Sequence, residues 1–83
     1  MQSAQVKIGG AEEHEFELAT LVVQTSSQFS SNIQIQVEGK KVNGKSIMGM
    51  TYLALMDDDL VTVTADGSDE SEALSALSDL LRG

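Results

Sequence analysis

The chain has 83 residues, enough for one small domain with a single hydrophobic core and no separate catalytic module. Thirteen acidic residues against five basic residues give a net charge of -8, which disfavours binding to nucleic acid and to anionic membrane surfaces. There is no cysteine and no signal-like N-terminal segment, so we expect a cytoplasmic protein without disulfides. We expect the protein to have no cofactor and no enzymatic activity of its own. Any activity would be exerted on or through a partner.

The first half of the chain combines strand patterns with one ambiguous segment. Apolar and polar side chains alternate over residues 4–8, as in a half-buried strand that ends at the glycines that follow. Residues 16–29 fit a helix or a strand equally well, because helical spacing coexists with a β-branched run. Residues 33–37 alternate again, and Glu38 and Gly39 form a turn that leads back through residues 40–43, which predicts a β-hairpin.

The second half begins with a serine in a helix-capping position. Ser46 precedes apolar residues at helical spacing, so we expect it to be the N-cap of a short helix that ends at the acidic residues 57–59. Residues 61–65 are rich in β-branched side chains and alternate between apolar and polar, which predicts a strand. The leucines of residues 68–81 predict an amphipathic helix. The expected fold is a two-layer α+β domain over residues 1–83, in the order βαββαβα, with helices on one face of one sheet.

Three segments resemble the HPr proteins, the small phosphocarriers of the bacterial sugar phosphotransferase system. Residues 39–50 (GKKVNGKSIMGM) resemble the regulatory-serine segment of HPr from Gram-positive bacteria. Residues 19–24 (ATLVVQ) resemble its first helix, and residues 67–74 (GSDESEAL) resemble the start of its last helix. The segments fit without gaps over residues 4–81. The resemblance implies an open-faced sandwich of a four-stranded antiparallel sheet and three helices, and it makes residues 16–28 a helix.

The chain departs from the family at the histidine site. HPr proteins carry histidine, any residue, arginine, proline and alanine at the start of the first helix, and only Ala19 matches here. Glu15 takes the place of the histidine, Glu17 that of the arginine and Leu18 that of the proline. That chemistry needs an imidazole acceptor and groups that stabilise added negative charge, so two carboxylates predict no histidine phosphotransfer. We expect Glu15→His with Glu17→Arg to restore most of the activity, and Leu18→Pro to add less.

Other interpretations of this segment stay open. His14, the single histidine, lies one place before the expected position and is the alternative phosphate acceptor if the chain shifts there. A histidine between two glutamates is also typical of a solvated residue. Glu15 either imitates the charge of a phosphorylated histidine or marks a decayed site, and acidic residues in a first helical turn are stabilising in any case.

Ser46 is the strongest functional candidate. A phosphate there would meet the free amides and the positive end of a helix dipole. Three of the five basic residues, Lys40, Lys41 and Lys45, are close in sequence and predict a local cationic edge. By resemblance, HPr kinase/phosphorylase phosphorylates this serine, and it is the partner that we expect.

Apolar residues after Ser46 are candidates for a partner-binding surface. They are Ile47, Met48 and Met50, some of which are also expected to fill the core. By resemblance to the catabolite-repression HPr, in which glutamine replaces the histidine, a catabolite repressor protein is a further candidate partner. That paralogue keeps the arginine and proline that are absent here. Enzyme I is not expected as a partner.

No metal site is expected. The acidic residues 57–59 lie in a turn, and residues 66–70 lack the glycine and glutamate of a calcium loop. Three function classes follow: a regulatory protein phosphorylated at Ser46, a phosphocarrier that uses His14, and an interaction module that uses neither site.

Overall fold

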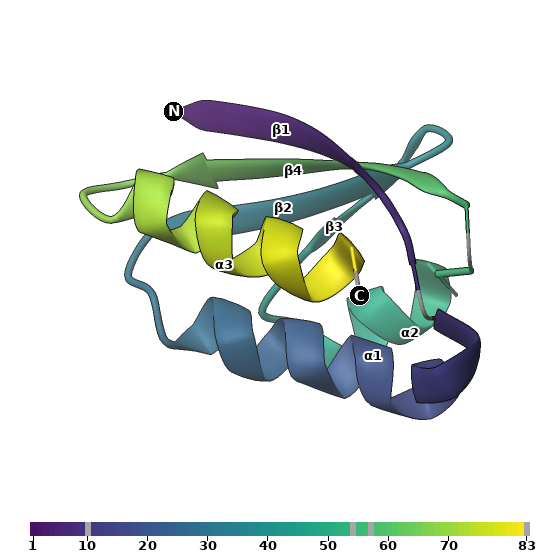
Figure 1. The fold of residues 1–83 in the computed structure, drawn as a ribbon. Helices are drawn as coiled ribbons and strands as arrows, with labels where there is room; N and C mark the ends of the chain where they lie inside the picture. Colours follow the sequence, from purple (N-terminus) through teal and green to yellow (C-terminus); the bar gives the residue numbers. More distant parts are fainter. Residues whose placement is uncertain (10, 54, 57, 83) are drawn as a thin grey trace.

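The computed structural model describes residues 1–9, 11–53, 55–56 and 58–82, with the side chains of residues 11–17 outside the description. It forms one layer of strands and one of helices (Figure 1). The elements are β1 (Gln2–Lys7), α1 (Ala11–Ser27), β2 (Asn32–Val37), β3 (Lys40–Asn43), α2 (Ile47–Leu53), β4 (Leu60–Asp66) and α3 (Glu70–Arg82). The order βαββαβα is confirmed.

The four strands form one antiparallel sheet in the order β1-β4-β2-β3. β4 lies inside the sheet, where Val63 pairs with Ala4 of β1 and with Ile35 of β2. All three helices cover the same face of the sheet (Figure 1). The predicted open-faced sandwich is therefore confirmed. Among the described residues, none of the helices has the length and hydrophobicity needed to span a bilayer.

The core lies between the sheet and the helices. Alternate residues of β2 and β4 are buried, because every second side chain of a strand points to the same face. The helices bury an apolar stripe against them, as expected for amphipathic helices. The principal core residues are Ile33, Ile35, Val61, Val63, Leu18, Val22, Met50, Leu53, Leu74, Leu77 and Leu81.

The predicted hairpin turn has the backbone that its sequence favours. Glu38 has a φ of 48° and Gly39 a φ of 83°, so both central residues are left-handed, as a type I′ turn requires. The strands pair in register beside it, with Val37 opposite Lys40. This turn places Lys40 at the start of the edge strand, near α2.

Asp69 joins the start of α3 to the connection between α1 and β2. It directly precedes α3, and its carbonyl accepts the Ala73 N–H at 3.0 Å. Its carboxylate, however, accepts the backbone N–H groups of Ser30 at 2.9 Å and Ser31 at 3.0 Å, together with the Ser31 hydroxyl. The Ser31 hydroxyl bond, followed by the Ser30 backbone bond, lowers the pKa of Asp69 from its usual 3.8 to about 2.

The first helix is longer than predicted. It begins at Ala11, whereas the family resemblance places its start near residue 16. A proline at position 18 would oppose helical structure before it, because proline has no N–H and its ring clashes with the carbonyl four residues earlier. Leu18 has neither restriction, and residues 11–17 include one alanine and four glutamates, which favour a helix. The missing proline thus accounts for the earlier start.

Candidate functional site

Ser46 occupies the N-cap of α2, as its sequence position predicts. Its hydroxyl oxygen accepts the backbone N–H of Gly49 at 3.2 Å, and its carbonyl accepts that of Met50 at 3.0 Å. Its own N–H donates to the carbonyl of Asn43 at 3.0 Å, which ties the helix start to the end of β3. The hydroxyl therefore lies beside helix amides and at a half-buried position of the surface.

The surroundings of the Ser46 hydroxyl suit added negative charge. The first turn of α2 contains no acidic residue, so no carboxylate from that turn opposes an anion there. Gly49 has no side chain beside the hydroxyl, and a Cβ at this position would lie 3.5 Å from Ser46 Oγ and 3.0 Å from the Val42 Cβ. Because the space between Ser46 and Val42 is too tight for a side chain at position 49, the amides of the first turn lie directly beside the hydroxyl.

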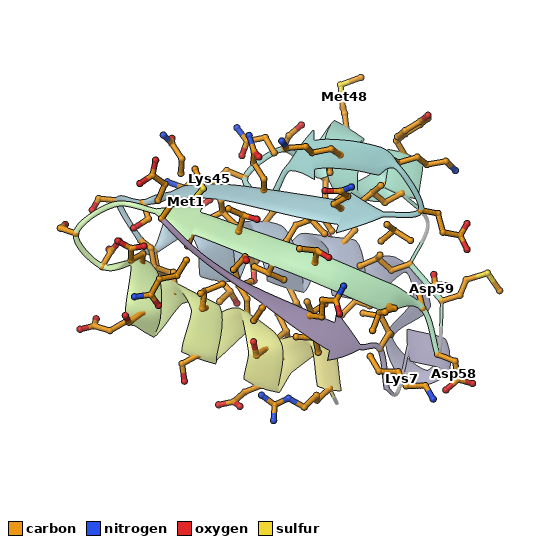
Figure 2. The ribbon with its side chains drawn as sticks, turned by 90° about the horizontal axis from the view of Figure 1, so that it is seen from above. Met1, Lys7, Lys45, Met48, Asp58 and Asp59 are labelled. Atoms are coloured by element: carbon orange, nitrogen blue, oxygen red, sulfur yellow. The ribbon has the colours of Figure 1, made fainter. Side chains whose placement is uncertain are left out.

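An exposed apolar surface adjoins Ser46. Met48 is 82% exposed, and its side chain extends outward from α2 (Figure 2). Ile47 and Tyr52 are also exposed, and Lys40 Nζ lies 5.4 Å from the centroid of the Tyr52 ring. We call these four residues, Ile47, Met48, Tyr52 and Lys40, the α2 patch. Tyr52 was not predicted from the sequence, although its spacing of four residues from Met48 signals a shared helix face.

The prediction that Met50 belongs to a partner-binding surface is wrong. Met50 is only 1% exposed and packs in the core with Leu53. Residues two apart lie about 200° around a helix, so Met48 and Met50 point to opposite sides of α2. Met48 therefore faces solvent, and Met50 faces the core.

The three lysines near Ser46 do not form the single cationic edge that their sequence positions suggest. Lys45 donates from Nζ to the carbonyl of Phe29 at 2.8 Å, just beyond the end of α1. Lys41 pairs with Gln36 and lies on the opposite side of β3 from Lys40, because neighbouring residues of a strand face opposite ways. Lys40 is therefore the lysine of this group that lies beside the exposed face of α2.

The residues at the family's histidine position lie inside α1. His14 and Glu15 are the fourth and fifth residues of the helix, and their side chains are outside the described part of the structure, as is that of Glu17. In an α-helix only the first four N–H groups lack an internal partner. The N–H groups from Glu15 onward are therefore used by the helix itself. The expectation that Glu15 stands at the helix start is corrected by this backbone.

The acidic segments give no metal centre in the part of the chain that the structure describes. No group of three His, Cys, Asp or Glu side chains there could hold a metal ion. Asp57, one of the acidic residues considered from the sequence, lies outside the described residues. The carboxylate of Asp69 is used to bind Ser30 and Ser31.

The βαββαβα sandwich with a capping serine at its second helix defines a class of small phosphocarrier-type proteins. A family model described as the PTS HPr component phosphorylation site matches residues 2–83, and the chain belongs to the HPr family. Proteins of this family are phosphocarriers rather than enzymes proper.

Solved structures of the family are similar over nearly the whole chain. HPr from Bacillus anthracis is 35% identical with a TM-score of 0.90, over 98% of this chain and 96% of that one. The HPr-C-His structure from Thermoanaerobacter tengcongensis is 40% identical with a TM-score of 0.84, over 98% and 91%. The solution structure of Crh, the catabolite-repression HPr of Bacillus subtilis, is 33% identical with a TM-score of 0.69, over 98% and 96%. The chain is thus similar both to phosphocarriers and to a regulatory relative.

Proposed function

We propose that this protein is a regulatory member of the HPr family that HPr kinase/phosphorylase phosphorylates at Ser46 and that does not transfer phosphate through histidine. The observation that carries the proposal is the position of the Ser46 hydroxyl, at the N-cap of α2 and next to the α2 patch. The hydroxyl is the acceptor, and the patch is the docking surface for the kinase. The whole of residues 1–83 acts as one HPr-like domain.

A phosphate on Ser46 would be stabilised where it forms. It adds about 1.5 to 2 negative charges, which the free amides of the first turn and the helix dipole favour. The hydroxyl already accepts the N–H of Gly49, so the phosphate oxygens can take over this bond. Lys40 contributes a cation beside the exposed face of α2, while Lys41 offers a positive charge to a partner that reaches around the sheet edge.

The loss of the histidine route is supported by the backbone of α1. Glu15 replaces the acceptor and lies where the helix uses its own N–H groups, so neither an imidazole nor open amides are available at that position. Phosphotransfer through His14 is the alternative function, and an interaction module without phosphorylation is the second. A catabolite repressor is a candidate partner of the phosphorylated form, and Enzyme I is not expected to act on the chain.

Two incubations distinguish these functions by intact mass. The protein is treated with Enzyme I and phosphoenolpyruvate, and separately with HPr kinase/phosphorylase and ATP. We expect one phosphate to be gained only with the kinase. Gain with Enzyme I would instead identify a phosphocarrier, and no gain in either incubation would favour the interaction module.

Ser46→Ala is expected to abolish the gain of phosphate, whereas Ser75→Ala, at an exposed serine of α3, is expected to leave it unchanged. Loss of the N-cap should also cost about 1 kcal/mol of stability, or roughly 4–8 °C in Tm for a domain of this size. Circular dichroism must therefore show that the Ser46→Ala protein is folded at the assay temperature. Phosphorylation of the folded Ser46→Ala protein at the original rate would contradict the proposed site.

A further inference from the structure

Methionines are the most readily oxidised side chains of this protein. The sequence contains four methionines, no cysteine and no tryptophan. Met48 is 82% exposed and Met50 is 1% exposed, although both lie in α2. Met1 and Met56 are exposed as well, but they lie outside the α2 patch, at the start of the chain and in the connection between α2 and β4. An oxidant in solution thus reaches one methionine of the patch directly.

We propose that Met48 is a redox modification site, and that its oxidation to the sulfoxide by a peroxide weakens docking of the kinase and so slows phosphorylation of Ser46. This inference rests on the proposed function. Met48 lies two residues after the Ser46 acceptor and projects away from the body of the protein (Figure 2). It is the most exposed apolar side chain of the α2 patch, where a partner would bury it first.

The modification is a transfer of one oxygen atom. A lone pair of the thioether sulfur attacks one oxygen of hydrogen peroxide, and the O–O bond breaks. The sulfur is oxidised to a sulfoxide. The leaving hydroxide takes up the proton of the oxygen that was transferred to sulfur, and it departs as water. Methionine sulfoxide reductases reverse the change, so the site is able to cycle.

Oxidation of Met48 changes the surface without changing the core. The sulfoxide converts a flexible apolar side chain into a polar one that carries a strong acceptor, which disfavours its burial against a partner. Ile47 and Tyr52 remain exposed beside it, so the apolar area of the patch is interrupted near Ser46. The core methionine, Met50, is shielded by the sheet and keeps its packing. A loss of phosphorylation would therefore arise without loss of folding.

The test compares the unaltered chain with Met48→Leu and with the matched control Met56→Leu. Each protein is treated with hydrogen peroxide, peptide masses locate the sulfoxides, and two quantities are measured: the initial rate of Ser46 phosphorylation, and binding to the kinase without ATP. We expect Met48 to oxidise at least about ten times faster than Met50, as its exposure implies. Oxidation should slow phosphorylation of the unaltered chain and of Met56→Leu about tenfold, which corresponds to losing part of one buried side chain.

Met48→Leu is expected to keep its rate after peroxide treatment, because its remaining exposed methionines lie outside the patch. Treatment with methionine sulfoxide reductases should restore the rate of the unaltered chain, and Tm should stay unchanged throughout. An unchanged rate after Met48 is oxidised, or an equal loss in Met48→Leu, would overturn the redox site while leaving Ser46 as the phosphorylated residue. If the untreated chain neither bound the kinase nor gained phosphate, the proposed function and the redox site would both be rejected.

Discussion

The double variant Glu15→His/Glu17→Arg is expected to take up no more phosphate from Enzyme I than the unaltered chain. This result differs from the expectation based on side-chain charge alone, which assigns most of the recovery to these two substitutions. Because α1 begins at Ala11, position 15 lies inside the helix. From this position onward, each backbone N–H already donates to the carbonyl four residues earlier. A new imidazole there would have no open helix start to receive the charge of the phosphate.

Adding Leu18→Pro is expected to supply that helix start. A proline at position 18 removes one N–H and clashes with the carbonyl of residue 14, so it ends the helical structure that precedes it. The amides of the following turn then become free to bind an anion, as at other helix N-termini. The triple variant should take up phosphate measurably faster than the double variant when trace Enzyme I and phosphoenolpyruvate are used and initial rates are recorded.

The single variant Leu18→Pro measures the cost of this change. We expect it to lose about 3 kcal/mol or more of stability from the proline itself, and a further ~1–3 kcal/mol from the lost Leu18 side chain, which is buried in the core. Urea unfolding at low temperature gives the free energy, and far-UV circular dichroism shows whether α1 has shortened. If the double variant were as active as the folded triple variant, the helix start would not be the obstacle.

Asp69→Asn is expected to lower Tm at neutral pH by about 5 °C or more, because one neutral acceptor replaces a carboxylate that binds Ser30 and Ser31. The pKa of Asp69 in the folded state, about 2, lies below its usual 3.8, so the folded state favours the charged form. Its contribution to stability is therefore complete above pH about 4 and is lost as the pH falls towards 2.

The pH dependence of Tm provides the check. The unaltered protein should lose stability steeply between pH 4 and 2, and the Asp69→Asn protein should lose less over that range, so the two curves converge at low pH. Asp79→Asn is the matched control, because Asp79 is an exposed residue of the same helix with a 3.9 Å ion pair to Arg82. A steep acid limb that persisted unchanged in Asp69→Asn would assign the acid sensitivity to other carboxylates.

Strands with one buried face could be predicted closely from the sequence. Residues 33–37 and 61–65 lie within β2 and β4, because alternation reports directly on which side chains face the helices. The first strand was predicted over 4–8 but runs from Gln2 to Lys7, since an edge strand with polar ends carries less alternation. The type of α1 was ambiguous from its pattern and required the family resemblance, and its start depended on a proline that is absent.

The candidate site was predictable as far as local contacts define it. Ser46 was placed at an N-cap by its neighbours alone, and the structure gives that cap. Whether Met48 or Met50 is exposed depends on which side of α2 faces the sheet. The sequence of this short helix alone does not reveal that side. Lys45 donates a hydrogen bond to Phe29, which lies sixteen residues away in the sequence. The position of Tyr52 beside Lys40 depends on how α2 packs near β3. Such long-range contacts have no local pattern.

The interior position of β4 has a consequence for the order in which the molecule folds. The β2–β3 hairpin joins residues that are close in the chain, whereas β1 and β4 join distant ones, with Gln2 opposite Ala65. Long loops are costly to close early, so the hairpin should gain its hydrogen bonds no later than β1. Pulsed hydrogen exchange during refolding would detect the opposite order as earlier protection of the β1 amides. Although β1 precedes β4 in the chain, it therefore waits for residues 60–66 before it joins the sheet.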